Sequence, residues 1–337
     1  MGFSSQSGQV ILRSQAVAGT YQADTGTTGV GVKLRGGSLG PNRELLVPDA
    51  EIGGGRDVVD AYLGAVSFSG DYEMYGRVDA LATLFKACLG TAAAPVTATG
   101  VTTHTITPSD SGSLPLLSVE ENIGGNLETF KYNDCVVNTL HLECDANGYL
   151  MVTAGLIGIK QIAGATKTVA PVWDETPMIV GTNVTVTYNA VSLPAKSFSI
   201  DINNNFEDDD YRLGSFYLGD LTAKRREVTA SFSIRESSSA LWRQATYGLP
   251  AATEAGGLTT KNQLVITAKT YEAIQGGTPT TPNEVAITIP KFVLRPYGLD
   301  PSGDDIIEND VEGQAIRPLS ATPLMTAAIK TAKATIS

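Results

Sequence analysis

Histidine, tryptophan and cysteine are scarce in this chain of 337 residues, with two, two and three copies respectively. The two histidines, His104 and His141, have no Gly-x-Ser-x-Gly turn to accompany them, so a serine-type catalytic triad has little support. The three cysteines, Cys88, Cys135 and Cys144, lack the spacing of metal ligands. We therefore predict buried reduced thiols, typical of a protein made in the cytoplasm, and no metal, cofactor or catalytic site.

Long apolar runs are also absent. No run approaches the roughly 20 residues that span a bilayer, so no membrane partner is expected. Residues 1–13 have no basic region followed by an apolar core, and we expect no secretory signal there.

Positive charge is in deficit. Lysine and arginine number 24 against 35 aspartate and glutamate, which gives a net charge of −11 and a pI of about 4.7. This balance argues against a protein that grips nucleic acid phosphates tightly.

Hydrophobic residues make up 42% of the chain, enough for folded cores, and its length suits two domains of roughly 150 residues. We expect a first β domain with an N-terminal arm at residues 1–165 and a second at 166–337. The polar segment 163–175 is the candidate connection between them.

Abundant Gly, Thr and Val, with apolar and polar residues in alternation, predict mostly strands. They are expected at residues 9–13, 44–47, 61–72, 102–107, 116–120, 131–144, 149–159, 184–188, 197–202, 214–221, 227–235, 263–271 and 284–294, with one more strand and a tail within 315–329. Helical periodicity predicts helices at 76–89, which Gly90 ends, and at 238–247. Loops are expected at 19–31, 91–100 and 276–283, and Asn147-Gly148 predicts a hairpin turn.

The middle of the chain repeats itself, which indicates that one structural unit is used twice. The phrases at residues 119–122 and 130–132 return 81 residues later, and that at 152–155 returns 76 residues later. A second echo links Ser-Phe-Ser at 67–69 with Ser-Phe-Ser at 231–233, each leading into a predicted helix. The copies that begin at Val119 and at Ile200 are expected to occupy equivalent places in the assembly.

The chain resembles the major tail tube proteins of long-tailed, siphovirus-like bacteriophages. The resemblance rests on the helix phrase at 76–90 after an alternating strand, on 116–122 followed by 130–144, and on 198–215 leading into 226–234. It implies a mainly β fold of tandem β-sandwich or barrel units, each with a flanking helix. Their sheets would join those of neighbouring subunits into a ring-shaped β-barrel.

The resemblance also implies the function and the partners. A non-enzymatic virion protein would form rings of three chains, pseudo-hexameric through the repeat, or of six, and the rings would stack into the phage tail tube. Tail terminator, tape measure and distal tail proteins would be partners, and genomic DNA would pass through without tight binding, since an acidic or neutral wall repels phosphate. The protein would be made in the host cytoplasm, and its loops 19–31 and 276–283 would reach neighbouring rings and order on assembly.

Two charge runs are candidates for assembly contacts. Glu207, Asp208, Asp209 and Asp210 could hold a divalent cation, but they lack the alternating spacing and turn glycine of an EF-hand, so a solvated inter-subunit or lumen-facing turn is preferred.

The second run is Lys224, Arg225 and Arg226. These residues could touch DNA, but in an acidic protein they favour pairing with acidic loops of a neighbouring ring.

Other local features have ordinary readings. Residues 53–56, Gly-Gly-Gly-Arg, lack the ending of a phosphate-binding loop and predict a flexible connection. Trp173 and Trp242 are expected to be packing anchors, and both histidines surface or half-buried residues.

Two alternative functions stay open. One is another non-enzymatic phage protein, such as a tail terminator or capsid decoration protein. The other is a strand-rich polysaccharide hydrolase, which needs a carboxylate pair about 5 to 10 Å apart that the sequence does not nominate.

Overall fold

The computed structural model describes residues 4–22, 29–53, 56–58, 60–125, 127–236, 238–277, 280–299 and 306–336. Strands account for 50% of the chain and helices for 8%, so the expected mainly β class is confirmed. Within these described ranges, no helix is both long and apolar enough to cross a membrane.

The described part of the first half contains twelve strands and one long helix, after a short 3₁₀ turn at Ser5–Ser7. Their bounds are β1 Gln9–Ser14, β2 Gly29–Val32, β3 Leu34–Gly37, β4 Gly40–Leu46, β5 Tyr62–Tyr75, α1 Val78–Leu89, β6 Gly90–Ala92, β7 Val96–Ala98, β8 Val101–Pro108, β9 Leu117–Ile123, β10 Glu128–Asp145, β11 Met151–Gly158 and β12 Lys160–Ile162.

The second half begins with a 3₁₀ turn at Gly181–Asn183 and contains eight strands and a shorter helix. Their bounds are β13 Val184–Tyr188, β14 Val191–Leu193, β15 Ala195–Asn203, β16 Glu227–Arg235, α2 Ala240–Tyr247, β17 Asn262–Ala273, β18 Pro282–Leu294, β19 Glu308–Ala315 and β20 Thr326–Thr331. Both predicted helices are present, and β13 and β16 have the predicted bounds.

β10 organises the sheet because it has two neighbours along each edge. Its first part pairs with β9 and β12, and its second part pairs with β15 and β11. The ladder shifts register between Tyr132 and Cys135, next to Asp134, whose φ of 56° is left-handed. Such an irregularity bends a strand, so a single strand can serve two differently directed sheets.

The pairings form a branched, open antiparallel sheet. From β10 one branch runs through β11 to β5 and its neighbours β3 and β4, and another runs through β15, β16 and β19 to β18. β18 then leads to β17 and β13 on one side, and to β20 and β8 on the other. No branch returns to its start among the described strands, so the expected barrel is not closed within one chain. Closure would require the outer strands of two branches, such as β4 and β14, to pair with each other, and each of these pairs only with its own hairpin partner.

The helix α1 lies at the centre of the core, and eleven of its twelve residues are buried. The Ala80 N–H donates to Asp174 Oδ2 at 2.7 Å, which satisfies one of the free donors of the first turn. Gly90, with a φ of 101°, follows the helix and caps it, as predicted.

The two halves share a sheet and a core. β10 and β15 pair from Thr139 with Asn203 to Asp145 with Ser197, and β8 pairs with β20. One hydrophobic cluster contains residues from both halves. The boundary expected at residue 165 lies in the connection between β12 and β13, and it stays a prediction.

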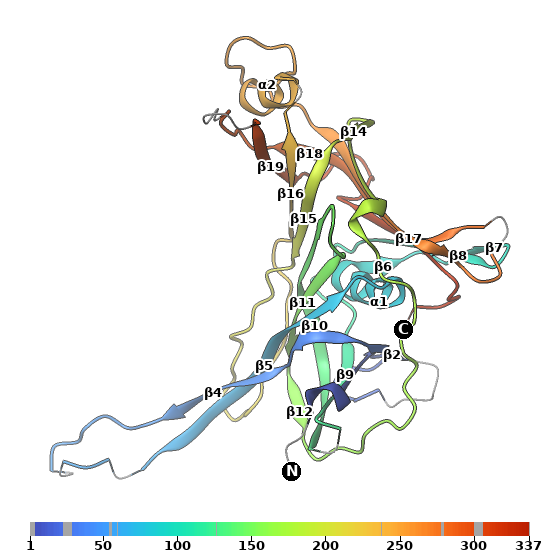
Figure 1. The fold of residues 1–337 in the computed structure, drawn as a ribbon. Coiled ribbons are helices and arrows are strands. Elements are labelled where there is room, and N and C mark those ends of the chain that lie inside the picture. The colour runs from blue at the N-terminus through green and yellow to red at the C-terminus, as the bar shows by residue number, and fades with distance from the viewer. Residues whose placement is uncertain are drawn as a thin grey trace.

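Figure 1 shows the large sheet as a steep layer, with α1 against one of its faces. The hairpin of β4 and β5 extends away from the body, and α2 lies at the opposite end of the molecule. The hairpins that contain β7, β8 and β17 project on the side of α1.

Several predicted segments differ from the structure. Residues 214–221, predicted to be a strand, make only isolated bridges, because their apolar side chains pack onto the sheet instead of pairing in a ladder. The predicted loop 91–100 contains the short strands β6 and β7, and β2 begins inside the predicted loop 19–31, of which residues 23–28 lie outside the described ranges. Residues 315–329 supply the end of β19 and most of β20.

The first repeated phrases fall in elements with different neighbours. Residues 119–122 lie in β9, between β1 and β10, whereas residues 200–203 lie in β15, between β10 and β16. A β-branched residue followed by an acid, with Asn at the end, suits many strands, so this echo does not mark equivalent elements. The second echo places residues 67–69 in β5 and 231–233 in β16, and each of these strands runs into a helix.

Candidate assembly surface

One continuous face of the sheet, which we call the polar face, extends over six neighbouring strands: β5, β11, β10, β15, β16 and β19. No side chain in its central row is buried. Register partners in that row cross all six strands: Glu73, Thr153, His141, Asp201, Thr229 and Gln314. Because successive side chains point to opposite sides of a strand, residues such as Leu140 and Ile200 lie in the core on the other face.

Carboxylates dominate the charge of the polar face, and serine and threonine occupy many positions between them. The exposed acids at these strand positions are Asp71, Glu73, Glu143, Asp201, Glu227, Glu308, Asp310 and Glu312. Basic side chains offset part of this charge, since Lys196 and Arg235 both pair with Glu308, and Arg295 lies 3.1 Å from Glu312. A surface of this balance repels phosphate.

One histidine sits in the middle of the polar face. His141 Nδ1 lies 2.5 Å from Asp201 Oδ1, and its Nε2 lies 3.4 Å from Glu143 Oε2. The hydrogen bond with Asp201 raises the pKa of His141 above its ordinary value of 6.5. Protonation would therefore place a positive charge between two acids, across the ladder that joins the two halves.

The predicted acidic run lies in the connection between β15 and β16, residues 204–226, which we call the 204–226 loop. Glu207, Asp208 and Asp209 are exposed, and Glu207 lies 3.4 Å from Lys224. Asp210 pairs with Arg212 at 2.6 Å. In the part of the chain that the structure describes, no cluster of three or more His, Cys, Asp or Glu could hold a metal ion. The acids are solvated, and their contact with another subunit stays a prediction.

The predicted basic run does not act as a unit. Lys224 and Arg225 are exposed, but Arg226 turns inward, and its Nε donates to Asn204 Oδ1 at 2.8 Å. Asn204 in turn donates to the backbone carbonyls of Cys88 and Val137, both at 3.0 Å. Arg226 therefore anchors the loop to the body of the molecule, a role that the sequence pattern alone did not separate from its neighbours.

The same basic run lines one wall of a groove of about 520 Å³. Across the groove Arg317 forms an ion pair with Asp110 at 2.8 Å, so only part of its charge is free. Lys224 is also paired, with Glu207, and the contact of this run with an acidic loop of a neighbouring ring stays a prediction.

The 204–226 loop folds onto the sheet instead of extending into solvent. Phe206, Leu218 and Leu221 form a hydrophobic cluster with Val136 of β10 and Ile157 of β11. The Val66 N–H donates to the Phe216 carbonyl at 2.8 Å, which ties the loop to β5. The loop thus covers the end of the polar face nearest β4 and β5.

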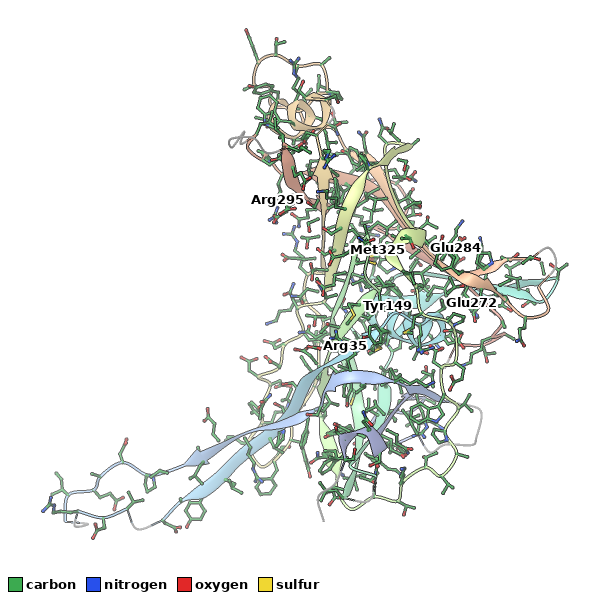
Figure 2. All side chains as sticks on the ribbon, viewed as in Figure 1. Arg35, Tyr149, Glu272, Glu284, Arg295 and Met325 are labelled. Carbon is green, nitrogen blue, oxygen red and sulfur yellow. The ribbon has the colours of Figure 1, made fainter. Side chains whose placement is uncertain are left out.

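The hairpin of residues 44–63, which we call the β4–β5 arm, carries a run of exposed apolar side chains that sequence reasoning missed. Their exposed fractions lie between 49% and 109%, and the residues are Leu45, Leu46, Val47, Ile52, Val58, Tyr62 and Leu63. Figure 2 shows the side chains of the arm standing clear of the rest of the molecule. The sequence feature that could have indicated this arm is a group of large apolar residues on both sides of the glycine-rich residues 53–55. Gly54 and Gly55 lie outside the described residues.

The histidine prediction is half right. His141 is half-buried, but His104 is buried, with Nε2 2.8 Å from the Lys333 carbonyl, because β8 pairs with β20 and the C-terminal segment covers it. Trp242 donates from Nε1 to the Tyr297 carbonyl at 2.9 Å, as a packing anchor would.

Trp173 packs beside β2. Its ring lies so close to Gly31 that a Cβ there would be 2.9 Å from it. This tryptophan is also a packing anchor, as predicted.

Comparison with known families gives a match over both halves. Residues 5–315 are similar to the family described as phage tail tube protein. The matched range contains the polar face, the 204–226 loop and the β4–β5 arm. A search of curated proteins found no match.

Proposed function

The chain belongs to the phage tail tube protein family, and we propose that it polymerises as stacked rings into a tube that conducts DNA into the host. The family is structural and non-enzymatic, and its place is the tail of the virion. Terminator, tape measure and distal tail proteins are the proposed partners at the ends and inside of the tube.

The observation that carries this proposal is the polar face. Fixed carboxylates repel phosphate over roughly the Debye length, about 8–10 Å at physiological salt. A wall that neutralised many phosphates would instead bind DNA through counterion release. A lumen lined by the polar face would let DNA slide, while α1 and the core would lie on the outer side.

We also propose that each chain supplies two related units, residues 1–165 and 166–337. The support is a pairing pattern that occurs twice in the same order. β1 pairs with β2 and β9 as β13 pairs with β14 and β17. β10 pairs with β9, β11 and β12 as β18 pairs with β17, β19 and β20.

The strands before the helices agree with this correspondence. β5 lies between β4 and β11 and runs into α1, as β16 lies between β15 and β19 and runs into α2. The central Phe of each Ser-Phe-Ser lies in the strand that precedes the helix, where Phe68 pairs with Pro41 of β4 and Phe232 pairs with Phe198 of β15. On this basis, three chains would present six units around one ring.

The loops 19–31 and 276–283 are proposed to contact neighbouring rings. Gly19 and Gln22 attach the start of the first loop to the body through Asp134 and Ser118, at 2.7 and 2.9 Å. The second loop is the tip of the β17–β18 hairpin. Because β2 begins at Gly29 and contains the buried Val30, the deletion in the first loop is confined to residues 23–28. This deletion, or that of residues 276–283, should leave soluble subunits that fail to stack.

Negative-stain imaging of the purified protein tests the proposal. Hollow tubes are expected, with end views of three chains carrying six related units, and the variant lacking residues 276–283 serves as the comparison. Solitary rings that never stack would favour a terminator-like role, six chains per ring would overturn the trimer, and a strictly monomeric protein would overturn the proposal.

A further inference from the structure

The two halves of the chain meet in a contact within the sheet. It has two parts. β15 pairs with the second part of β10, and the 204–226 loop, which connects β15 to β16, covers Val136 and Ile157 with apolar side chains. A strand edge and the loop that follows it therefore seal the same junction.

The first half contains the counterparts of β15 and its loop, and both lack a partner in the described part of the chain. By the repeated pairing pattern, β4 corresponds to β15, and the β4–β5 arm corresponds to the 204–226 loop. β4 pairs along one edge only, with β5. The apolar side chains of the arm are exposed, Leu46 to 52% and Ile52 to 109%, whereas those of the 204–226 loop are buried against the sheet.

The second half contains the counterpart of the receiving surface. β18 corresponds to β10, and its pairing with β17 runs only as far as Phe292 with Asn262, so the last two residues of β18, Val293 and Leu294, have no strand neighbour on this edge among the described strands. Beyond the strand, the Tyr297 carbonyl already accepts from Trp242 Nε1. Apolar side chains are exposed on either side of residues 300–305, which lie outside the described ranges, at Leu299, Ile306 and Ile307. The first of them is 36% exposed and the second 55%.

We infer that β4 and the β4–β5 arm of one chain dock on the end of β18 and the start of β19 of a second copy of the same chain. The contact repeats between chains what β15 and the 204–226 loop form within one chain. It is head-to-tail, because the two surfaces differ, and such contacts close into a ring when the rotation permits. The inference rests on the proposed function, since it assigns the surfaces by which the rings would form.

The match is chemical as well as topological. Pairing would satisfy the free backbone groups along the outer edge of β4, which otherwise invite uncontrolled association. Burial of the arm would remove a group of large apolar side chains from water, the dominant favourable term in most protein association. The same step would continue the polar face from one chain into the next, because β4 adjoins β5 and the start of β19 adjoins β16.

Photo-crosslinking tests the assignment in assembled full-length protein. A benzophenone amino acid replaces Leu46, and an equal mixture of isotopically light and heavy chains identifies crosslinks between copies. The expected product joins the arm of one chain to the tryptic peptide of residues 292–330 of another, since Arg295 and Arg317 are each followed by proline. The control places the same group at Val169, which is 95% exposed in the connection between the halves and should give no crosslink to that peptide.

The outcomes separate the inference from the proposed function. Tubes that assemble but crosslink Leu46 only to other peptides, or give no crosslink between chains, would overturn the inference and leave the tube function standing. A wild-type protein that forms neither rings nor tubes would overturn both.

A second variant guards against an uninformative crosslink. Leu46→Asp should raise the critical concentration for assembly about tenfold or more, since it places a charge in an apolar contact, without changing the melting temperature of the monomer. Val169→Asp should change neither quantity. Assembly of Leu46→Asp at the wild-type concentration would contradict the inference.

Discussion

His141 and Asp201 face each other across the ladder between β10 and β15, with 2.5 Å between Nδ1 and Oδ1. The pair lies on the polar face, on the ladder that joins the two halves of the chain. Glu143 lies on the other side of the imidazole ring, and the register partner of His141 on β11 is Thr153. The charge of one histidine is thus coupled to the contact between the halves.

This coupling predicts a pH dependence. Because the pKa of His141 is raised in the folded state, its stabilising contribution is complete below the ordinary value of 6.5 and is lost as the pH rises through the folded pKa. Asp201→Asn should lower the pKa of His141 and remove most of this effect. The pair is partly solvated, so the difference should stay below about 1 kcal/mol. NMR titration of the His141 ring measures the shift, and an unchanged pKa in Asp201→Asn would contradict the assignment.

The anchor of the 204–226 loop predicts a large effect on stability. Asn204 is 1% exposed and bonds to two buried backbone carbonyls and to Arg226. Asn204→Ala leaves these groups unsatisfied and should lower the free energy of unfolding by roughly 2–4 kcal/mol.

Asp208→Ala is the matched control for the anchor, since Asp208 is an exposed member of the same loop. Its effect should stay within about 0.5 kcal/mol. Urea unfolding of both variants measures the difference, and equal stabilities would show that the loop is not held through Asn204.

The cysteines predict a simple reactivity test. All three are free and buried, and burial raises the pKa of Cys88 to about 12 and that of Cys144 to about 11, while the pKa of Cys135 is raised further. Since the thiolate is the reactive form, none should react with a disulfide reagent in the native protein at pH 8. All three should react in denaturant, which serves as the positive control. Rapid labelling of a native thiol would show that its site opens locally.

The sequence predicted local structure where alternation and periodicity are strong. In β16, Val228, Ala230 and Phe232 alternate with smaller polar residues, and the strand has the predicted bounds. The helix α1 was predicted within two residues because its apolar face is continuous and Gly90 follows it.

The sequence did not predict which strands meet. An alternating pattern specifies which face of a strand is buried, but it does not specify the strands that pair with it. The four pairing partners of β10 could therefore not be predicted. The same limit explains the misplaced first echo and the strand expected at 214–221. Leu218 and Leu221 there are apolar because they cover Val136 and Ile157, and this contact is visible only in three dimensions.

The candidate site was predicted by composition but not by residue. Net acidity suggested a wall that repels DNA, and the ladder registers identify the strands that could form it. The acidic run at Glu207 was noticed because it is contiguous, whereas the acids of the polar face are dispersed over six strands and form no motif. The β4–β5 arm was missed because exposure of apolar residues depends on what the fold leaves uncovered.

The polar face predicts how a reversal of charge would affect the passage of DNA. Glu73 and Glu227 are exposed on this face, and Glu73→Lys with Glu227→Lys replaces two negative charges per chain by two positive ones without removing a core side chain. Tubes should still assemble, but they should retain DNA, with a binding constant that falls steeply as salt rises.

The control, Glu254→Lys with Glu272→Lys, makes the same change at exposed positions away from this face; Glu272 projects on a separate hairpin in Figure 2. DNA retained by purified tubes between 50 and 200 mM salt, roughly the range over which phosphate contacts weaken, measures the effect. Equal retention by both variants would mean that net charge alone decides, and that the polar face does not line the lumen.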